Sequence, residues 1–124
     1  MKLVVRKVLR KGRGIFADRN FKKGDVIEVC PVVVLSAKDR KVIDQTALYD
    51  YYFSWGRDKK KAAIALGFGS FYNHSYAPNA VYKKDFLHHE IRFIAVSNIS
   101  KGKEIVVNYN GKVDDQTSVW FESS

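Results

Sequence analysis

The chain has 124 residues, of which 46% are hydrophobic and 14% are aromatic, and its 22 basic and 13 acidic side chains leave a net charge of +9. This length and composition predict one folded domain with its own core and exclude a disordered tail. The chain lacks an apolar run of the roughly 18 residues that a membrane span needs, and it lacks the apolar segment of a signal peptide. Its one cysteine, Cys30, excludes an internal disulfide.

The net charge indicates a partner with negative charge, and nucleic acid is the first candidate. A basic surface that keeps the protein in solution by self-repulsion explains the charge equally well. The basic residues are distributed along the whole chain, so the sequence does not place them on one surface. The main clusters are Arg6-Lys7, Arg10–Arg13, Lys22-Lys23, Arg57–Lys61 and Lys83-Lys84.

The first third of the chain predicts short strands separated by glycine-containing turns, followed by a helical turn. Pro31 has no N–H for a sheet hydrogen bond, so we expect Val32–Leu35 to be a separate or edge strand. Ser36 and Asp39 have the spacing of a helix N-terminus, which predicts a short helical turn within Asp39–Ala47. The earlier strands are expected at Leu3–Leu9, Ile15–Ala17 and Val26–Cys30, with turns at Lys11–Gly14 and Lys22–Asp25.

The rest of the chain predicts more strands and little helix, so we expect a mainly β fold. Ten residues from Asn20 to Val29 and ten from Asn98 to Val107 share the pattern N-apolar-x-K-G-x-x-I-x-V, which we interpret as two similar turn–strand units. The expected strands are Tyr49–Trp55, Ala62–Leu66, Ala80–Lys83, Glu90–Val96 and Glu104–Tyr109, with hairpin turns at Gly56–Lys61 and Asp85–His89 and another turn at Asn98–Lys103.

Two polar segments are candidates for a site. Asn73, His74 and Ser75 follow one another within Leu66–Ala80, and such side chains favour a loop because they compete for backbone hydrogen bonds. Alone, this triplet is typical of a capped turn. The run Gly12–Gly14 either turns a hairpin or lets the backbone approach a cofactor closely, and no helical pattern follows it as a dinucleotide site would require.

Three segments in this order resemble the SET-domain protein lysine methyltransferases, most closely the minimal viral or bacterial type. They are Lys11–Ala17, the N-H-S-x-x-P-N-A run of Asn73–Ala80, and Lys101–Tyr109. The resemblance covers about residues 4–110 and implies one SET domain over 1–124, with 111–124 as a tail that completes the site. It also implies a β-clip-like fold of small curved sheets with a knot-like crossing, where the segment after N-H-S passes Glu104–Tyr109.

The resemblance implies S-adenosyl-L-methionine as cofactor. Arg13, Gly14 and Ile15 match the segment that offers main-chain groups to the carboxylate and amino ends of this cofactor. Asn73 is expected to hold it by polar contacts, and His74 largely by backbone contact near the adenine. His74 is expected to bind the cofactor and not to act as a general base.

Tyr109 is the expected catalytic residue, because it matches the tyrosine whose hydroxyl lies beside the transferring methyl group in the family. Tyr82 and Tyr51 fall where the family places further tyrosines of the substrate lysine channel. A tyrosine at the Tyr82 position would limit the room for added methyl groups, so we expect mono- or dimethylation. Isolated tyrosines more often end a strand in solvent, and seven tyrosines make chance matches common.

The chain lacks the cysteine cluster of the post-SET zinc module after Tyr109, and its three histidines and one cysteine are not grouped, so no metal site is expected. Trp120 is the candidate for packing over the adenine, and a dimer contact or a hydrophobic staple would explain it as well. The missing module makes a homodimer a reasonable expectation.

The expected substrate is a basic tail of a histone or another nucleic-acid-associated protein, modified in the cytoplasm, the nucleoid or a host nucleus. A basic enzyme should repel such a tail, so either an acidic groove exists or nucleic acid bridges enzyme and substrate. The alternative function is a non-catalytic basic β module that binds nucleic acid and stacks bases on the aromatic Tyr49–Trp55. The groove candidates are Asp44, Asp50, Asp85 and Glu90.

Overall fold

A computed structural model describes residues 2–117 and 119 of the chain as a mainly β structure. Two short 3-10 turns, η1 and η2, and one short helix, α1, interrupt the strands in this part. The elements are β1 (Leu3–Val8), β2 (Gly12–Ala17), β3 (Val26–Leu35), α1 (Ala37–Ile43), η1 (Ala47–Asp50), β4 (Phe53–Trp55), β5 (Lys61–Ala65), η2 (Gly69–Phe71), β6 (Asn73–His74), β7 (Ala80–Asp85), β8 (Glu90–Ala95) and β9 (Glu104–Val107).

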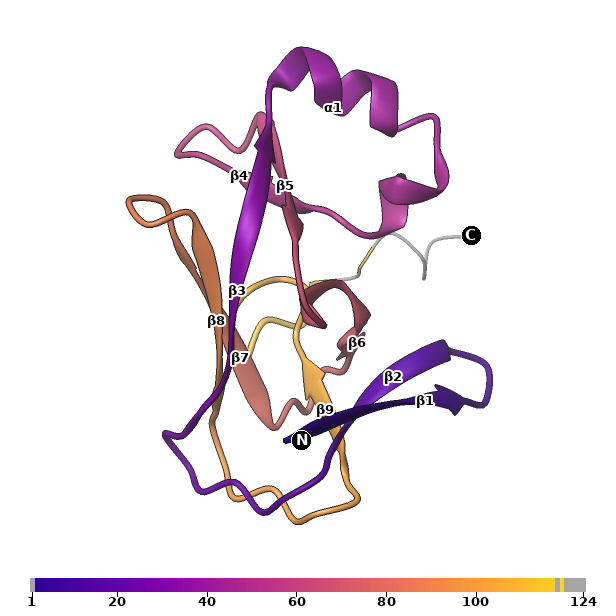
Figure 1. Cartoon of the computed structure of the whole chain (residues 1–124), viewed down its shortest axis with the longest axis vertical. Helices are drawn as coiled ribbons and strands as arrows, with labels where there is room; N and C mark the ends of the chain where they lie inside the picture. The colour runs from indigo at the N-terminus through magenta and orange to yellow at the C-terminus, as the bar shows by residue number, and fades with distance from the viewer. Residues whose placement is uncertain (1, 118, 120–124) are drawn as a thin grey trace.

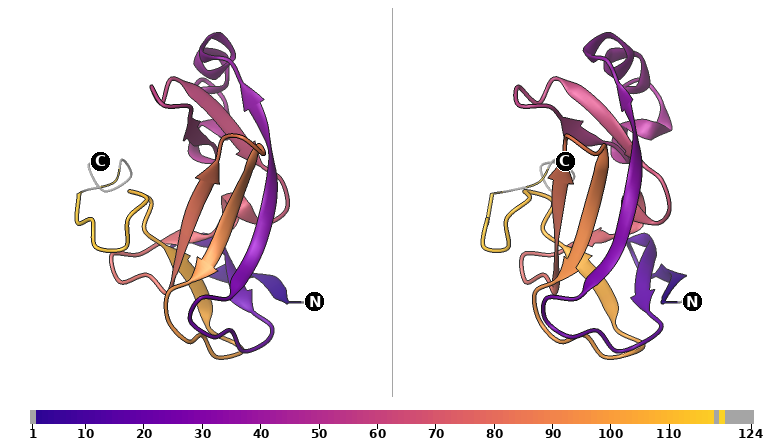
Figure 2. Two further views of the ribbon diagram at one scale, coloured as in Figure 1. Left: turned by 90° about the vertical axis from the view of Figure 1, so that its left-hand side faces the viewer. Right: turned by 60° about the vertical axis from the view of Figure 1, so that its left-hand side comes forward.

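The strands form two curved sheets, with the orders β1-β2-β9-β6 and β4-β5-β3-β8-β7. Figure 1 shows the second sheet beneath α1 and the β1–β2 hairpin at the opposite end of the molecule. The outer strands β4 and β7 of the second sheet approach each other. Two contacts between them show this: the ring centroids of Phe53 and Tyr82 lie 5.1 Å apart, and Lys84 Nζ donates to the Ser54 carbonyl at 2.6 Å. The curled sheets of the expected fold are therefore confirmed, and Figure 2 shows the curl from the side.

The core lies between the two sheets and follows the two-residue alternation of the strands. On β8, Ile91, Phe93 and Ala95 are buried, while Arg92 between them is exposed. Tyr72 stacks on the Phe93 ring with 4.2 Å between ring centroids. This stack anchors the segment before β6 to the core.

The expectation that Pro31 separates two strands is wrong, because β3 runs without a break through this residue. Pro31 lies where the strand changes partner: Val26–Pro31 pairs with β8, and Val32–Leu35 pairs with β5. The Pro31 carbonyl accepts from the N–H of Leu66 at 2.9 Å. The missing N–H of proline is tolerated at this exchange of partners.

The aromatic segment from Tyr49 is also different from the expectation of one strand. Residues Ala47–Asp50 form the 3-10 turn η1, in which the Thr46 side chain accepts from the Leu48 N–H, and only Phe53–Trp55 is strand. The expected helix N-terminus is confirmed, since the Ser36 hydroxyl caps α1 by accepting from the Asp39 N–H at 3.1 Å. The hairpin of β7 and β8 is confirmed as well.

The two turn–strand units with the shared pattern pack against each other with near two-fold symmetry. Phe21 and Ile99 exchange backbone hydrogen bonds of 2.8 Å in both directions. The Asn20 side chain accepts from the Lys101 N–H at 2.8 Å, and the Asn98 side chain accepts from the Lys23 N–H at 3.0 Å. Both turns need glycine, because φ is +91° at Gly24 and +92° at Gly102. The mutual pairing ties the loop before β3 to the loop before β9.

The knot-like crossing surrounds β9. Strand β6 runs parallel to β9 and pairs His74 with Val107. The chain that follows β9 then crosses the segment after β6, where the Tyr76 hydroxyl donates to the Thr117 carbonyl at 3.2 Å. Asn79 closes the same loop, since its amide donates to the Glu104 carbonyl and accepts from the Val106 N–H, both at 2.9 Å. The expected passage of the two segments is thus confirmed.

We predict that Asn79→Ala lowers the free energy of unfolding by about 2 kcal/mol, because two partly buried backbone groups of β9 lose their partner. Asn98→Ala is the matched control, since it removes one exposed bond and should cost about 1 kcal/mol or less. Urea unfolding followed by tryptophan fluorescence measures both. Equal losses in the two variants would contradict the role of Asn79 in holding the crossing.

Candidate functional site

Tyr109 lies directly after β9 and between two cavities. Its N–H donates to His74 Nδ1 at 2.9 Å, and its hydroxyl donates to the Tyr72 carbonyl at 2.7 Å. One cavity has a volume of about 280 Å³ and the other about 500 Å³. Both are lined by Tyr109, together with Asp50, Tyr51 and Ser70. The residue expected to be catalytic is therefore in the wall that the cavities share.

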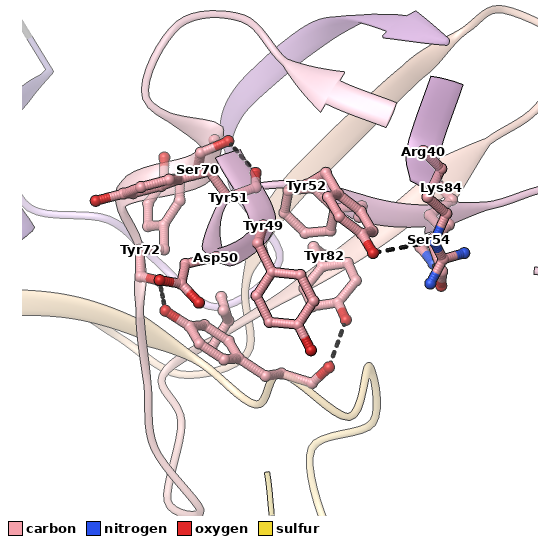
Figure 3. Close-up of a pocket in the computed structure, with 14 residues that line it drawn as sticks. Arg40, Tyr49, Asp50, Tyr51, Tyr52, Ser54, Ser70, Tyr72, Tyr82 and Lys84 are labelled. Atoms are coloured by element: carbon pink, nitrogen blue, oxygen red, sulfur yellow. Dashed lines mark hydrogen bonds between the residues drawn. The ribbon is translucent and has the colours of Figure 1, made fainter. Parts of the chain in front are cut away.

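The smaller cavity, here called the tyrosine cavity, is lined by six of the seven tyrosines of the chain. Figure 3 shows the labelled tyrosines around a common space, with Arg40, Ser54 and Lys84 grouped at one side. Its lining consists of Arg40, Tyr49, Asp50, Tyr51, Tyr52, Phe53, Ser54, Gly69, Ser70, Tyr72, Tyr82, Lys84, Val107 and Tyr109.

The hydroxyls of Tyr82 and Tyr109 are bound to main-chain carbonyls and stay protonated. Tyr82 donates to the Tyr109 carbonyl at 2.9 Å. Burial raises the pKa of Tyr82 to about 12, and burial together with the Glu104 carboxylate raises the pKa of Tyr109 to about 12. Both side chains are therefore neutral near pH 7 and act as hydrogen-bonding groups, not as bases.

The expected channel residues Tyr51, Tyr82 and Tyr109 all line the tyrosine cavity. Tyr82 packs inside it against Phe53, whereas Tyr51 is 39% exposed and lies on the rim next to Phe71. The structure thus places the three predicted tyrosines together.

Two cations lie at one side of the tyrosine cavity. Lys84 Nζ donates to the carbonyl and the hydroxyl of Ser54, and burial, with the positive charges of Lys59 and Arg40, lowers the pKa of Lys84. Arg40 donates to the Tyr52 hydroxyl at 3.0 Å and to the Lys59 carbonyl at 2.6 Å. This side of the cavity is therefore positively charged.

The four carboxylates that were candidates for an acidic groove do not come together at the two cavities. Of the four, only Asp50 lines either cavity. Asp44 accepts from the Tyr52 hydroxyl, Asp85 binds His88, and Glu90 pairs with Arg92. The carboxylates were expected to face the substrate, but local hydrogen bonds at the surface hold three of them instead.

The larger cavity, here called the hairpin cavity, brings together Arg13, Asn73 and His74 of the predicted cofactor residues. The Arg13 guanidinium stacks over the Phe71 ring at 4.5 Å. Its lining consists of Arg10, Lys11, Gly12, Arg13, Asp50, Tyr51, Ser70, Phe71, Asn73, His74 and Tyr109.

Asn73 connects the β1–β2 hairpin to β9. Its amide donates to Glu104 Oε2 at 2.7 Å and to the Arg13 carbonyl at 3.2 Å. A Cβ at Gly14 would lie 2.5 Å from that carboxylate oxygen and 2.8 Å from Asn73 Nδ2, so a side chain here would displace this hydrogen-bonded pair. Gly14 and Ile15 do not line the cavity, and the Ile15 side chain is fully buried opposite Ile105.

Two further expectations concern the tail and metals. Trp120 lies outside the described residues. In the described part, Asp85, His88 and Glu90 bring potential ligand atoms within 4.8 Å of one another at the tip of the β7–β8 hairpin. His88 Nδ1 contacts Asp85 Oδ2 at 2.8 Å, and Arg92 contacts Glu90 at 3.1 Å. This cluster is a hydrogen-bonded hairpin tip, separate from both cavities.

Glu28 was not among the predicted site residues, although it holds the segment that contains Tyr72. Its two carboxylate oxygens accept from the Tyr72 hydroxyl at 2.7 Å and from the Phe68 N–H at 2.9 Å. Burial and this carboxylate raise the pKa of Tyr72, and the Tyr72 carbonyl is the acceptor of the Tyr109 hydroxyl. A lone carboxylate inside the apolar run Val26–Leu35 was the signal that could have revealed it. Ser70, Phe71 and Glu104 were missed as well.

Residues 12–110 match the family model of the SET domain. A histone-lysine N-methyltransferase of Schizosaccharomyces pombe, described as H3 lysine-37 specific, is 32% identical over 121 residues, which cover 97% of this chain and 77% of the relative. The chain belongs to the SET-domain family. The match and this relative make it a protein-lysine methyltransferase.

Solved structures agree with this assignment. The crystal structure of a candidate histone methyltransferase of Plasmodium falciparum has a TM-score of 0.69 and 27% identity, and the match covers 97% of this chain and 96% of that chain. A chain of apo ctPRC2, in a structure with substitutions in Ezh2, has a TM-score of 0.72 at 20% identity and is covered to 15%, against 86% of this chain. The second likeness concerns the fold alone. None of the helices in residues 2–117 has both the length and the apolar composition that a membrane crossing requires.

We predict that Tyr72→Phe lowers the free energy of unfolding by about 2 kcal/mol, because the partly buried Glu28 carboxylate loses the donor of a charge-assisted hydrogen bond. Tyr52→Phe is the matched control, since its hydroxyl donates to the exposed Asp44 carboxylate at 2.7 Å and should contribute less than about 1 kcal/mol. Chemical denaturation of both variants measures the difference. If Tyr52→Phe cost as much as Tyr72→Phe, the Glu28 bond would not be a special support of the site.

Proposed function

We propose that this protein transfers the methyl group of S-adenosyl-L-methionine to a lysine in an extended basic protein tail, and that mono- and dimethyllysine are its main products. One observation carries the proposal: Tyr109 lies in the wall between two cavities of different chemistry. A methyl transferase needs two such compartments, because cofactor and substrate must meet at one point in line.

The hairpin cavity fits the cofactor. Its volume of about 500 Å³ is within the range of small-molecule sites. Arg13 and Asn73 offer a guanidinium and an amide for the polar end of the ligand, and Phe71 and Tyr51 add aromatic surface. When bound, S-adenosyl-L-methionine supplies an activated methyl group. Gly14 and Ile15 would contribute through their main chain only, and Trp120 stays a prediction.

The tyrosine cavity fits the side chain of the substrate lysine. A lysine must be neutral to accept the methyl group, although its free pKa is about 10.4. A narrow aromatic cavity disfavours the ammonium form, because burial withdraws the charge from water. The positive side chains of Arg40 and Lys84 in the same cavity disfavour it further.

Tyr109 and Tyr82 would position the reacting groups. Tyr109 faces both cavities, and the hydroxyl of Tyr82 is fixed on the Tyr109 carbonyl at 2.9 Å. Since both hydroxyls are neutral at physiological pH, they would orient the amine by hydrogen bonds and would not remove its proton. Tyr82 also occupies space that further methyl groups would need, which supports the preference for low methylation states.

The substrate class rests on the relatives. The Schizosaccharomyces pombe relative is described as a histone-lysine N-methyltransferase and the Plasmodium falciparum structure as a candidate histone methyltransferase. A histone-like tail is extended and carries lysine, and it can pair with an exposed strand edge beside the cavity. We therefore propose a histone or a similar basic tail.

We predict that the protein binds S-adenosyl-L-methionine and that Asn73→Ala weakens this binding by about tenfold or more, because the amide that joins the hairpin to β9 is lost. Tyr109→Phe should bind within about threefold of wild type but lose about 100-fold in methyl transfer, since one positioned hydroxyl is removed. Isothermal titration measures binding, and methyl transfer to histone mixtures measures activity.

Asn98→Ala is the control for this experiment, because its exposed turn is distant from both cavities. It should bind the cofactor like wild type. The absence of S-adenosyl-L-methionine binding by folded wild-type protein would reject the proposed cofactor, and full activity of Tyr109→Phe would reject the catalytic role of this tyrosine.

We predict that Tyr82→Phe shifts the products toward trimethyllysine, because the cavity gains space and loses the hydroxyl that holds the amine. Mass spectrometry of a histone peptide after prolonged reaction measures the product distribution. Tyr49→Phe, at the exposed rim of the same cavity, should leave the distribution unchanged. Trimethyllysine as the main product of the wild-type protein would contradict the proposed preference.

A further inference from the structure

The β1–β2 hairpin concentrates positive charge. Between residues 2 and 17 the chain has six basic side chains and no carboxylate. Five of them lie within residues 6–13, a segment that we call the basic ribbon, and all five are exposed. They are Arg6, Lys7, Arg10, Lys11 and Arg13.

The basic ribbon extends beyond the part of the β1–β2 hairpin that pairs with β9. β1 and β2 pair over their whole length, but only Ile15 and Phe16 of β2 pair with β9. Toward the tip the two strands pair only with each other, and Figure 1 shows this hairpin below α1. At the tip, Leu9 is 88% exposed.

Two features of the basic ribbon destabilise the folded hairpin. Lys7 and Arg13 are directly opposite each other across the two strands, and like charges in this position destabilise a sheet. Within the described residues, none of the ribbon's basic side chains forms an ion pair with a carboxylate. Arg10 also adopts a φ of +67°, which is unfavourable for a side chain other than glycine. A bound anion would offset the repulsion between the like charges.

The proposed cofactor does not explain the charge. S-adenosyl-L-methionine has two positive groups and one carboxylate, so it adds positive charge. Arg10, Lys11 and Arg13 line the hairpin cavity, but Arg6 and Lys7 do not. The charge of Arg6 and Lys7 therefore lies outside the proposed cofactor site and is available to an extended anion.

We propose that the basic ribbon binds the phosphate backbone of duplex DNA. A two-stranded β-ribbon has the width that the major groove admits, and basic side chains on both of its faces can reach the phosphates of the two strands. Contacts of this kind neutralise phosphates and release counterions, which provides affinity without sequence specificity. Leu9 at the tip is the one exposed apolar side chain of the ribbon, beside five exposed basic ones, a composition that favours a polyanion over a lipid surface.

This interaction goes beyond methyl transfer and places DNA on the side of the hairpin cavity. The tyrosine cavity opens among β4, β7 and η1 and has no ribbon residue in its lining. A substrate tail and a DNA duplex could therefore bind at the same time. The DNA would then hold a basic tail near an enzyme that repels it.

The test measures fluorescence anisotropy of a labelled 20-base-pair duplex of mixed sequence at several salt concentrations. The double variant Arg6→Gln and Lys7→Gln should bind about 30-fold more weakly at 0.15 M salt, and the slope of log K against log salt should fall by about 1.8, which is the counterion effect of two lost phosphate contacts. The control variant Lys38→Gln and Lys41→Gln makes the same change of charge on α1, at the other end of the molecule, and should bind within about twofold of wild type.

Binding of S-adenosyl-L-methionine and the thermal unfolding midpoint report that each variant is folded, and both should match wild type. Equal losses of DNA affinity in the two double variants would overturn the proposal, because binding would then follow net charge alone. Tighter binding to vesicles that contain phosphatidylserine than to the duplex would also overturn it, as would no DNA binding by the wild-type protein.

Discussion

The parallel pairing of β6 with β9 is the constraint on which the site depends. It involves only Asn73 with Val106 and His74 with Val107. Because β9 also pairs with β2 on its other side, this short contact brings the β1–β2 hairpin, the Asn73–His74 pair and Tyr109 to one place. The Tyr109 N–H then binds His74 directly at 2.9 Å. Two cavities can share a wall only because the chain crosses itself here.

The polar groups of the site are held by main-chain acceptors and one carboxylate. Tyr109 and Tyr82 donate to carbonyls, and Glu28 holds the turn that presents the Tyr72 carbonyl. Such partners are fixed by the sheets, so the hydroxyls are oriented before any ligand binds, which is what positional catalysis requires. Burial keeps the same hydroxyls protonated. In the proposed mechanism the two hydroxyls orient the amine and do not act as bases, so methyl transfer depends on geometry and on an environment that disfavours the lysine ammonium.

The sequence predicted what local chemistry determines. The glycine turns, the Ser36 cap and the β7–β8 hairpin are confirmed, because each depends on a few neighbouring residues. The resemblance in three segments predicted the family and brought Arg13, Asn73 and Tyr109 into one hypothesis. Contacts between distant strands were not predictable in this way. The mutual pairing of Phe21 with Ile99, the continuous β3 through Pro31 and the hydrogen bond between Glu28 and Tyr72 all depend on which segments become neighbours.

The proposed lysine site and the proposed DNA-binding surface lie in different parts of this small protein. The tyrosine cavity contains Arg40 and Lys84 and only one carboxylate, Asp50, so it favours a neutral lysine side chain but does not attract a basic tail. An enzyme with this cavity gains nothing in association rate from its own field, since like charges slow the encounter. Recruitment must then come from a different surface or from a bridging polyanion. The basic ribbon is such a surface. It lies outside the tyrosine cavity, so the positive charge that would bind DNA is separate from the place where the lysine must lose its proton.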